Sequence, residues 1–510
     1  MSAAPLPNDS TVAVIGAGAM GSGIAQIAAV AGHPVKLVDA RDGAAVSAIE
    51  GIRTQLNKLA DKGKLSPDAA QAAAARLSVA SSVSDLADAA LVVEAIVEDL
   101  AAKQALFVSL EGVVGSDAIL ATNTSSISIT AIGAVLKRPE RLAGLHFFNP
   151  APLMPLVEIV SGIGTDVSVA DTLFATAKAW GKTPVHARST PGFIVNRVAR
   201  PYYAEALRLL QEGAADVATI DAVMREAGGF KMGPFELMDM IGHDVNFAVT
   251  RSVWNAFFND KRFTPSLIQQ ELLEGGFLGR KSGRGFYDYR EGAVKLSAAT
   301  EAPRTLNSTI TLHGKTEIAT ALAERLSNAA TPFTSNASAS DERLATVGDA
   351  VVFVTDGRSA TQRAAESGIA NTVLIDLALD YSSATRIAIS CAKQCSASTL
   401  NDAIALLQAA GLQVSLFKDI PGLAVMRTVT MLANEAADAV NQGVCSAADV
   451  DAAMRLGVNY PRGPLAWAEQ IGVHTVRDVL RNLGISTGED RYRISPLIQQ
   501  ACYAGGSLHE

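Results

Sequence analysis

A glycine-rich segment near the start of the chain has the residue types and spacing of a dinucleotide-binding turn. Gly16, Gly18 and Gly21 follow the apolar run 12–15 and open the apolar segment 20–31. The first glycine permits a tight turn, the second lets a pyrophosphate approach the backbone, and the third lets a helix pack closely on a strand. Free N–H groups at the helix N-terminus would then hold the diphosphate. The cofactor-binding residues predicted in this turn are Gly16, Gly18, Ala19, Met20 and Gly21.

Asp39 bears on which dinucleotide, NAD or NADP, the glycine turn would bind. It lies eighteen residues after Gly21, directly after the strand-like run 35–38. An acidic residue at this place accepts a hydrogen bond from a ribose 2′-hydroxyl, and its charge would repel a 2′-phosphate. The sequence therefore favours NAD over NADP, although Arg41 nearby leaves that preference open. The alternative interpretation is a structural glycine turn that holds no ligand.

His146 and Glu158 are suited to acid–base chemistry. His146 lies in the strand-like run 143–148, and Glu158 lies inside the apolar run 156–160. An imidazole beside a nicotinamide can take the proton of an alcohol while hydride leaves its carbon. A neighbouring carboxylate orients the ring and stabilises the imidazolium that forms. A charge in a buried strand is costly unless it is paired, so Glu158 needs a partner. The structural alternative for His146 is a satisfied core histidine.

The elements that must position these residues alternate between strands and helices. The strand-like runs are residues 12–15, 35–38, 91–96, 119–122, 143–148 and 156–160, with helical stretches between most of them. This alternation predicts a mainly parallel sheet covered on both faces. Between residues 44 and 75 a polar–apolar pattern carries Arg53, Lys58, Lys62 and Lys64. It predicts a helical hairpin that projects from the sheet domain.

An internal repeat sets the organisation of the rest of the chain. The pattern becomes helical after Pro191, and Pro191-Gly192-Phe193 recurs 230 residues later as Pro421-Gly422-Leu423. Leu267-Ile-Gln-Gln270 recurs at the same offset as Leu497-Ile-Gln-Gln500. Ungapped matches at one offset indicate a duplicated helical domain. Between the two copies, the strand-like runs 350–354 and 373–376 suggest a reduced α/β unit without a glycine fingerprint.

The fold class expected is therefore α/β, with an N-terminal Rossmann-like parallel sheet, an all-α domain, a reduced α/β unit and a second all-α domain. The domains expected are residues 1–188 for NAD binding, 189–290 for substrate binding and dimerisation, 291–417 for the reduced unit, and 418–510 for a second, non-catalytic helical domain.

Composition excludes several other classes of protein. The chain has 510 residues, 49% of them hydrophobic, which is ample for sizeable cores. Its formal charge of −8 argues against a nucleic-acid partner. Cys391 and Cys395 lie four residues apart, but no second pair or nearby histidine completes a zinc site, so no metal is expected.

The segment from Thr11 to Gly32 contains no charged residue and resembles a membrane span or signal peptide in length. The ten residues before it carry Asp9 and no lysine or arginine, so they lack the positive region of a signal peptide. A strand, a turn and a buried helix explain the segment better. We expect no membrane partner and a cytoplasmic location.

Several sequence motifs, taken in order, resemble those of the L-3-hydroxyacyl-CoA dehydrogenase family. They are the glycine fingerprint, Glu94-Ala-Ile-Val-Glu98, Asn123-Thr-Ser-Ser126, His146-Phe-Phe-Asn-Pro150, Pro191-Gly-Phe-Ile-Val-Asn-Arg197, and Lys281 in a glycine-punctuated loop. These matches cover residues 11 to 288. The long format, with a second helical domain and no hydratase domain, is similar to the 3-hydroxyadipyl-CoA and 3-hydroxybutyryl-CoA dehydrogenases of phenylacetate catabolism.

The resemblance implies roles for individual residues. His146 would be the general acid/base, Glu158 its paired carboxylate, Ser125 the contact to the substrate's 3-oxygen, and Asn196 a group that places the substrate. On the NAD side the resemblance implies Asp39, Glu98, Lys103, Asn123, Asn149 and Lys281, with Asn149 orienting the nicotinamide. For CoA it implies Ser125, Lys62 and the position of Gln55, where we expect serine in relatives, so the contact at Gln55 stays open.

The second copy lacks the chemical groups of the first. The offset of 230 maps Asn196 to Met426, and, if it persists outside the helical repeat, Glu158 to Ala388 and His146 to Asp376. We therefore expect one active site per chain. The duplicate would supply an internal pseudo-dimer of helical domains, and a homodimer of whole chains remains possible.

The reaction expected is NAD-dependent oxidation of a (3S)-3-hydroxyacyl-CoA to the 3-oxoacyl-CoA, with a short-chain or dicarboxylic acyl group. Two alternatives are a hydroxy-acid dehydrogenase that acts without CoA and a dinucleotide-binding protein recruited to a structural role. The intact set of His146, Glu158, Ser125 and Asn196 argues against the structural role. The basic hairpin argues for a CoA thioester.

Overall fold

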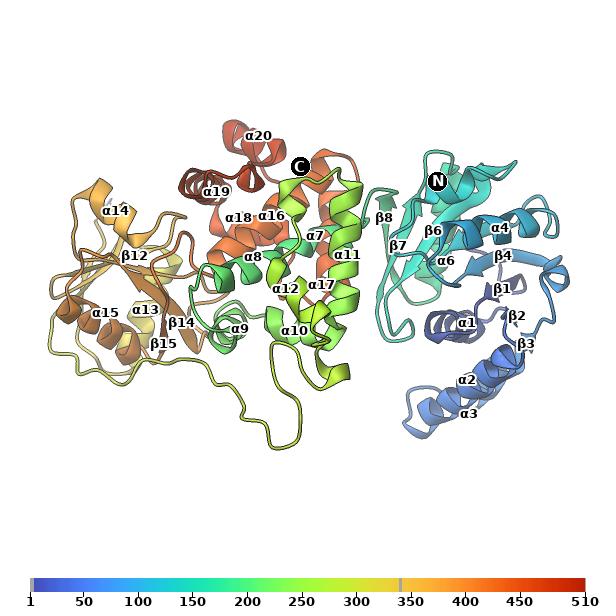
Figure 1. The fold of residues 1–510 in the computed structure, drawn as a ribbon, viewed down its shortest axis with the longest axis horizontal. Coiled ribbons are helices and arrows are strands. Elements are labelled where there is room, and N and C mark those ends of the chain that lie inside the picture. Colours follow the sequence, from blue (N-terminus) through green and yellow to red (C-terminus); the bar gives the residue numbers. More distant parts are fainter. Residues whose placement is uncertain (1–3, 339–341, 510) are drawn as a thin grey trace. The chain divides into compact units, whose positions relative to one another are not determined.

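The computed structural model describes residues 4–338 and 342–509, which divide into two compact units. The first unit consists of Met1–Arg197 together with Gln442–Val458. The second consists of Val198–Asn441 and Asn459–Glu510. Figure 1 shows that each unit is built around its own sheet or helices. A short segment from the second half of the chain is thus part of the N-terminal unit.

The first unit contains an eight-stranded sheet in the order β3-β2-β1-β4-β5-β6-β7-β8. Its strands are β1 (Thr11–Ile15), β2 (Val35–Val38), β3 (Leu77–Val79), β4 (Ala89–Glu94), β5 (Ile119–Thr122), β6 (Leu142–Phe147), β7 (Leu156–Ser161) and β8 (Thr183–Arg188). All neighbours are parallel except β6 and β7. The Rossmann-like parallel sheet is therefore confirmed. Its strand order reverses between β1 and β4, which is where such sheets bind ligands.

Helices cover both faces of this sheet, so its central strands are mainly apolar. Val12, Val14, Leu37 and Val93 are fully buried. The helices of the first unit are α1 (Ala19–Ala31), α2 (Ala44–Asp61), α3 (Pro67–Ala75), α4 (Leu100–Glu111), α5 (Ile129–Gly133), α6 (Val167–Ala179), α7 (Val195–Val198) and α17 (Ala447–Gly457). The pair α2 and α3 confirms the predicted helical hairpin. Ser66 caps α3, since its side chain accepts a hydrogen bond from the amide of Ala69.

The uncharged segment at the N-terminus is a strand, a glycine turn and a buried helix, as predicted. It forms β1 and α1, and most of α1 is buried against the sheet. Over the described ranges, no helix is long and apolar enough to cross a membrane.

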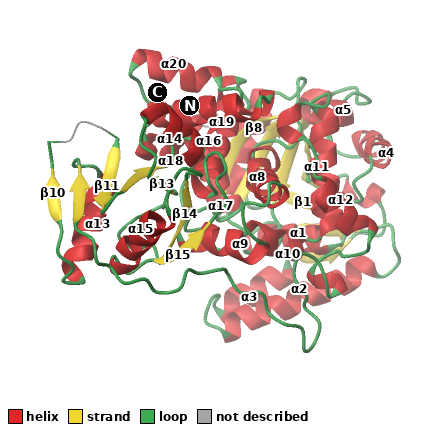
Figure 2. Ribbon diagram, turned by 60° about the vertical axis from the view of Figure 1, so that its left-hand side comes forward, coloured by secondary structure: helices red, strands yellow, loops and turns green. Residues whose placement is uncertain are grey.

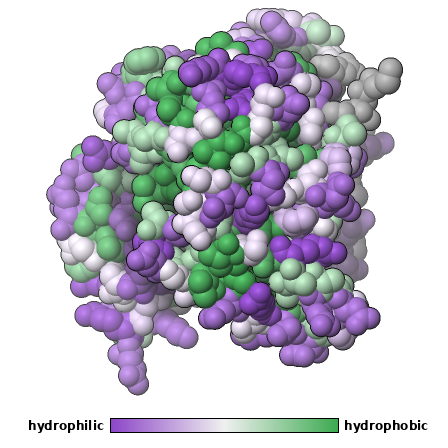
Figure 3. Space-filling view, turned by 90° about the vertical axis from the view of Figure 1, so that its right-hand side faces the viewer, coloured by the Kyte–Doolittle hydropathy of each residue, from purple (hydrophilic) through white to green (hydrophobic). Residues whose placement is uncertain are grey.

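The face drawn in Figure 3 is mixed, with hydrophobic side chains gathered near its middle and hydrophilic ones around them.

The second unit contains a seven-stranded mixed sheet in the order β10-β9-β11-β12-β13-β14-β15. Its strands are β9 (Ile310–His313), β10 (Thr334–Asn336), β11 (Arg343–Val347), β12 (Ala350–Val354), β13 (Thr372–Ile375), β14 (Arg386–Cys391) and β15 (Gln413–Leu416). Helices α13 (Glu317–Asn328), α14 (Ala360–Ser367) and α15 (Ala397–Ala409) accompany them. Figure 2 shows β10 and β11 toward one edge of this sheet. This sheet is the reduced α/β unit predicted from the sequence.

The other helices of the second unit form an all-α region. From the first copy they are α8 (Arg200–Gln211), α9 (Val217–Glu226), α10 (Pro234–Ile241), α11 (His243–Ala256) and α12 (Leu267–Glu274). From the second copy they are α16 (Val425–Asn441), α18 (Pro464–Ile471), α19 (Val473–Thr487) and α20 (Pro496–Ala504). The short 3₁₀ turns η3 (Lys261–Phe263), η4 (Arg280–Ser282) and η5 (Asp490–Tyr492) connect several of these helices.

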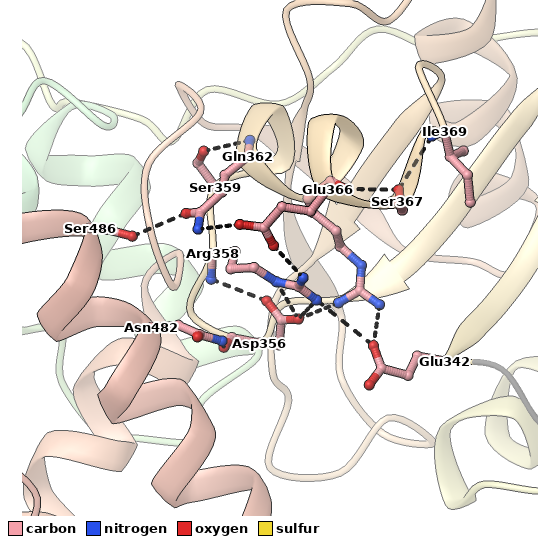
Figure 4. A network of polar contacts seen from close by, with 11 residues as sticks. Glu342, Asp356, Arg358, Ser359, Gln362, Glu366, Ser367, Ile369, Asn482 and Ser486 are labelled. Atoms are coloured by element: carbon pink, nitrogen blue, oxygen red, sulfur yellow. Dashed lines mark hydrogen bonds and ion pairs between the residues drawn. The ribbon is translucent and has the colours of Figure 1, made fainter.

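A polar network joins α19 to the reduced α/β unit (Figure 4). The carboxylate of Asp356, after β12, accepts hydrogen bonds from the guanidinium groups of Arg358 and Arg363. Asn482 of α19 donates to the backbone oxygen of Asp356 at 2.8 Å, and Ser486 donates to Gln362 at 3.2 Å. Glu366 pairs with Arg358, and Glu342 pairs with Arg363. Every charged group in the network therefore has a partner of opposite charge, which fits a structural role.

The sequence offset of 230 also holds in the two sheets. Leu145 pairs with Ile159 across β6 and β7, and Ile375 pairs with Ile389 across β13 and β14. Both members of the second pair lie 230 residues after the first. The structural equivalents of His146 and Glu158 are therefore Asp376 and Ala388, as the sequence offset predicts.

The second helix of each helical copy packs on the sheet of the other half of the chain. Helix α17 packs on β7 and β8 in the first unit, and its equivalent α9 packs on β14 in the second. The amide of Arg188 donates to the Val444 oxygen at 2.8 Å, and the amide of Lys418 donates to the Ala214 oxygen at 3.0 Å. These two bonds are related by the same offset. The exchange is therefore reciprocal, as in a two-fold symmetric dimer.

Within the second unit, buried polar contacts between the two helical copies follow the same symmetry. Helix α8 packs on its counterpart α16. Arg262 donates to Glu435 at 3.0 Å, and its equivalent Tyr492 donates to Glu205, the equivalent of Glu435, at 2.9 Å. Glu205 is fully buried and is also paired with Arg427 at 2.8 Å. A contact that recurs with its two partners exchanged between the copies is characteristic of an isologous, two-fold symmetric interface, which is here formed within one chain.

Candidate active site

The turn between β1 and α1 has the shape of a phosphate cradle. Gly16 has a φ of +102°, and a Cβ there would lie 2.4 Å from the Ala95 oxygen. A Cβ on Gly21 would lie 1.8 Å from the Gly16 oxygen, so only glycine permits this close helix–strand contact. A Cβ on Gly18, by contrast, would meet nothing within 4 Å. Gly18 is the N-cap residue of α1, and among the described residues no side chain caps the first amides of this helix. These features fit a bound diphosphate.

Asp39 holds this turn through its carboxylate. Its Oδ2 accepts a hydrogen bond from the Ala17 amide at 2.7 Å, and its Oδ1 accepts from the Arg41 side chain at 3.1 Å. Burial alone would raise the pKa of Asp39, but these bonds and the charge of Arg41 outweigh it and lower the pKa to about 2. Asp39 is therefore ionised at neutral pH.

His146 and Glu158 form a buried pair at the antiparallel junction of the sheet. They are directly opposite each other on β6 and β7, and His146 Nδ1 lies 2.6 Å from Glu158 Oε2. Glu158 is fully buried and His146 is 5% exposed. The imidazole packs against the rings of Phe148 and Phe193, with centroids 4.5 Å and 5.9 Å away. In the described parts of the chain, no hydrogen bond engages Nε2, the nitrogen that would meet a substrate.

The second oxygen of Glu158 holds the start of a helix. Oε1 accepts hydrogen bonds from the amides of Ile194 and Val195, both at 3.0 Å. Val195 begins α7, so the carboxylate satisfies amides that have no partner inside the helix. One buried side chain thus both orients His146 and anchors the segment that carries Asn196.

Glu98 gathers the Thr124–Ser126 turn around its carboxylate. Oε1 accepts hydrogen bonds from Thr124 Oγ1 at 2.7 Å, the Ser125 amide at 3.0 Å and Ser126 Oγ at 2.9 Å. Burial raises the pKa of Glu98, but these bonds and the charge of Lys103 outweigh it, so the net shift is downward. An ionised Glu98 therefore fixes the backbone on which Ser125 stands.

Ser125, Asn196 and Asn123 lie near this turn. Asn196 Nδ2 donates to the Ser125 backbone oxygen at 3.5 Å, which joins two residues 71 positions apart. Asn123 Oδ1 accepts from the Phe147 amide at 2.9 Å, so Asn123 is linked to the residue after His146. The structure therefore brings His146, Glu158, Ser125 and Asn196 into one connected region of the first unit.

The other predicted site residues are not all in this region. Lys103 is buried, with Nζ 2.6 Å from Glu94 and 3.4 Å from Glu98. Asn149 is exposed. Gln55 and Lys62 are exposed on the helical hairpin, as are its other basic side chains. Lys281 belongs to the second unit, where it is paired with Asp244.

Three polar residues of this region received no role from the sequence. Glu94 is fully buried, and Thr122 donates to it at 2.6 Å while Lys103 pairs with its other oxygen. Thr124 is the hydroxyl that Glu98 binds most closely. The signal for Glu94 was a charge at the end of a buried strand, which requires a partner. No signal in the sequence identifies the two threonines.

In the reduced α/β unit, Asp376 anchors the start of a helix as Glu158 does in the first unit. Asp376 Oδ2 accepts hydrogen bonds from the amides of Ala424 and Val425 at 2.9 Å and 2.8 Å. These amides are the equivalents, at offset 230, of the two that Glu158 holds. Burial raises the pKa of Asp376 to about 6 in spite of these bonds. A carboxylate from the strand equivalent to β6 thus anchors α16, and no imidazole is beside it.

Three protein-family models match the chain. The model described as 3-hydroxyacyl-CoA dehydrogenase, NAD binding domain, matches residues 11–190. The model described as 3-hydroxyacyl-CoA dehydrogenase, C-terminal domain, matches twice, at residues 192–289 and 422–507. Residues 352–421 match the 3-hydroxybutyryl-CoA dehydrogenase reduced Rossmann-fold domain. The duplicated helical domain predicted from the sequence is thus matched twice by one family model.

Similar proteins cover nearly the whole chain. A 3-hydroxyadipyl-CoA dehydrogenase of Escherichia coli (strain K12) is 45% identical over 97% of this chain and 97% of its own. A crystal structure of 3-hydroxybutyryl-CoA dehydrogenase from Escherichia coli K12 has a TM-score of 0.88 at 44% identity and covers 98% of this chain and 99% of its own. A probable 3-hydroxybutyryl-CoA dehydrogenase of Bacillus subtilis (strain 168) is 40% identical and matches 55% of this chain and 97% of its own.

Proposed function

The chain belongs to the 3-hydroxyacyl-CoA dehydrogenase family, and from that premise we propose which of its residues carry the reaction and which acyl group it prefers. The protein is an NAD-dependent oxidoreductase that converts 3-hydroxyacyl-CoA to 3-oxoacyl-CoA. The observation that supports the residue assignments best is the buried 2.6 Å contact between His146 and Glu158.

His146 is the general base of the proposed mechanism. Glu158 accepts the proton on Nδ1, which fixes the tautomer that leaves the Nε2 lone pair free. Nε2 takes the proton of the substrate's 3-hydroxyl as the C3–O bond becomes a carbonyl, and the hydride leaves C3. The imidazolium that forms is stabilised by the Glu158 carboxylate. In the reverse direction the same imidazolium returns the proton to the 3-oxygen.

Ser125 and Asn196 position the substrate in this proposal. Ser125 donates to the 3-oxygen, where negative charge develops during proton transfer. Glu98 holds the Ser125 amide at 3.0 Å, and Asn196 holds its carbonyl at 3.5 Å, so the serine is fixed on both sides. Such fixed donors cost no reorganisation when the reaction occurs.

NAD is the cofactor, and its nicotinamide supplies the hydride acceptor that amino-acid side chains do not provide. We propose that the glycine turn holds the diphosphate, Asp39 the ribose hydroxyls, and Asn123 and Asn149 the nicotinamide side. Lys103 then acts through Glu94 and Glu98, because its Nζ is paired with both. Lys281 would contribute from the helical domain.

We expect Asp39→Ala to raise the KM for NAD⁺ at least about tenfold. The variant loses a charge-assisted hydrogen bond, worth about 1.5–3 kcal/mol. It also removes the charge that repels a 2′-phosphate and releases Arg41, so kcat/KM for NADP⁺ should rise. Steady-state kinetics with both cofactors measure this, with the exposed Asp42→Ala as the matched control. An unchanged preference for NAD⁺ would exclude the role of Asp39.

The helical hairpin is the proposed site for the phosphates of CoA. Lys58, Lys62 and Lys64 are exposed on α2 and the turn after it. Exposed lysines attract phosphate as point charges, and this attraction weakens as salt rises. Gln55 is exposed on α2 and offers an amide in place of a hydroxyl.

Replacing Lys58, Lys62 and Lys64 together by glutamine should raise the KM for acetoacetyl-CoA by about 3- to 150-fold, given about 0.2–1 kcal/mol for each of three exposed charge pairs. The effect should shrink at high salt. The N-acetylcysteamine thioester of the same acyl group lacks the CoA phosphates and should show no change. A variant that neutralises the exposed Lys137, Arg138 and Lys178 is the control. Equal losses with both thioesters would count against a phosphate site on the hairpin.

One active site per chain is proposed, in the first unit. The second copy has Asp376 where the first has His146, Ala388 where it has Glu158, and Met426 where it has Asn196. None of these side chains can replace the imidazole as a base paired to a carboxylate. Two molecules of NAD bound per chain at saturation would contradict this proposal.

A short-chain or dicarboxylic acyl group is proposed for the substrate, with a place in phenylacetate catabolism and in the cytoplasm. The support is the full-length similarity to a 3-hydroxyadipyl-CoA dehydrogenase and a 3-hydroxybutyryl-CoA dehydrogenase. The test is the absorbance of NADH with acetoacetyl-CoA and with 3-oxoadipyl-CoA. Oxidation of NADH checks the reaction, and the ratio of kcat/KM between the two thioesters decides the acyl group. Turnover of neither would refute the proposal.

A further inference from the structure

A cavity of about 740 Å³ lies entirely within the second unit. Its walls come from α8, from α11, from the segment 261–269 and from η5 of the second helical copy. This volume is in the range of pockets that enclose small-molecule ligands. The cavity is completed only by residues of both copies, so it is a product of their pairing.

The cavity concentrates positive charge in a chain whose net charge is −8. Arg200, Arg208, Lys261 and Arg491 line it, against Glu212 and Glu489. Glu212 is held in bidentate fashion by Arg427, at 2.7 Å and 2.8 Å, and Glu489 is paired with Arg491. Both carboxylates are therefore paired with arginine, and Arg208 is in turn paired with the buried Glu205.

Two cations of the cavity differ in how they are held. The Arg200 guanidinium is buried, donates to Thr250 Oγ1 at 3.0 Å and lies 4.9 Å from the centre of the Tyr203 ring. Lys261 is exposed and forms no ion pair with the residues that the structure describes. A fixed guanidinium at one point and a mobile ammonium at another suit an anion that enters from solvent.

Two buried polar atoms on the cavity wall have no hydrogen-bond partner within residues 4–338 and 342–509. They are Ser266 Oγ and Arg491 Nε. Ser266 precedes α12 at the N-cap position, yet its side chain does not cap the helix. Buried polar atoms are normally satisfied, so each exception requires an explanation. Both atoms are fully covered, so a ligand oxygen would reach them only if their side chains turn toward the cavity.

Part of the remaining wall is apolar, beside the polar side chains of Gln211, Thr264 and Gln269. Leu207, Phe263 and Leu267 line the cavity, and Leu267 is 70% exposed. From this combination of cations, unsatisfied donors and apolar side chains, we infer that the cavity binds a carboxylate carried on a short aliphatic chain. Guanidinium groups match a carboxylate in bidentate geometry, and the apolar wall covers the methylene groups.

Such a carboxylate has two possible sources. One is the far end of a dicarboxylic acyl group on the substrate, which rests on the proposed function. The other is a free dicarboxylic acid that acts as an effector. Both present the same chemistry to the cavity, and their kinetics differ.

Isothermal titration of the full-length protein with adipate tests the inference without requiring turnover. We expect adipate to bind, and 1,6-hexanediol, its uncharged analogue, not to bind. Lys261→Met and Arg491→Met should each weaken adipate at least tenfold, while Lys315→Met, an exposed lysine outside the cavity, should leave it unchanged. Adipate that binds all three variants as tightly as the wild type, or no binding of adipate at all, would overturn the inference. Binding of inorganic phosphate in place of adipate would also overturn it.

Kinetics then separate the two sources. If the carboxylate belongs to the substrate, adipate competes with 3-oxoadipyl-CoA, and the two variants raise the KM for that thioester at least tenfold but not the KM for acetoacetyl-CoA. If it is an effector, adipate changes the turnover of both thioesters equally. Unaltered turnover of acetoacetyl-CoA by the variants shows that they are folded. Since binding is measured directly, loss of the proposed function and loss of this site give different results.

Discussion

Replacing His146 by glutamine is expected to lower kcat by about 10²–10⁴, the range for loss of a positioned general base. Glutamine is close in size to histidine and can still donate to Glu158 Oε2, so the buried carboxylate keeps a partner. It cannot accept a proton at neutral pH. The loss should therefore fall on kcat, while the affinity for NADH, measured by fluorescence titration, stays within about twofold of the wild type.

The measurement is NADH oxidation with acetoacetyl-CoA at saturating concentrations of both. His186→Gln is the control, because His186 is on β8 in the same sheet and its side chain is 44% exposed. We expect the control to keep full activity. Turnover of the His146 variant within threefold of the wild type would disprove the assignment of the base.

Glu158 allows its two roles to be separated by two substitutions. Glu158→Ala removes the acceptor of the Ile194 and Val195 amides, and each unsatisfied buried amide costs about 1–3 kcal/mol. This variant should be both unstable and inactive. Glu158→Gln keeps an oxygen for the two amides but places an NH₂ group against His146 Nδ1. The proton then moves to Nε2, which is the wrong tautomer for a base, and kcat should fall by about 10⁴.

Thermal unfolding and kcat of the two variants test this together. We expect the melting temperature of Glu158→Gln to stay close to that of the wild type and that of Glu158→Ala to fall by several degrees. Glu50→Gln, an exposed change on α2, controls for the substitution itself. If the glutamine variant keeps wild-type kcat, or if both variants melt alike, the division of roles between the two oxygens is wrong.

The sequence predicted the central strands and the glycine turn because their residue types leave few alternatives. Residues 12–15 are apolar, and residues 35–38 are apolar except for the partly exposed Lys36, because most of their side chains are covered. Two strands of the first unit's sheet were missed for the opposite reason. Residues 77–79 are largely exposed, and residues 183–188 include Pro184 and two basic side chains, so neither has the pattern of a buried strand. Both are edge strands of the sheet.

The candidate site was predictable to the extent that burial of charge forces pairing. Glu158 required a partner, and His146 was the residue that the family pattern supplied. The contacts of the second oxygen of Glu158 were not predictable, because their donors are backbone amides, which every residue carries. One donor to Glu98, the Ser125 amide, is of the same kind. The hydrogen bond from the Ala17 amide to Asp39 belongs to the same class. Such contacts depend on how distant segments meet, not on residue type.

Because α17 and α9 are exchanged within one chain, the helices that cover the two sheets are held in place at any protein concentration. The sheet that carries His146 is covered at β7 and β8 by a helix encoded about 290 residues later in the same chain. In a dimer of shorter chains, such cover would come from a second molecule and would be lost on dilution. Here the contributing segment is tethered, so its effective concentration does not depend on how much protein is present. The duplicated helical domain thereby makes the cover of the sheet that carries His146 independent of any encounter between molecules.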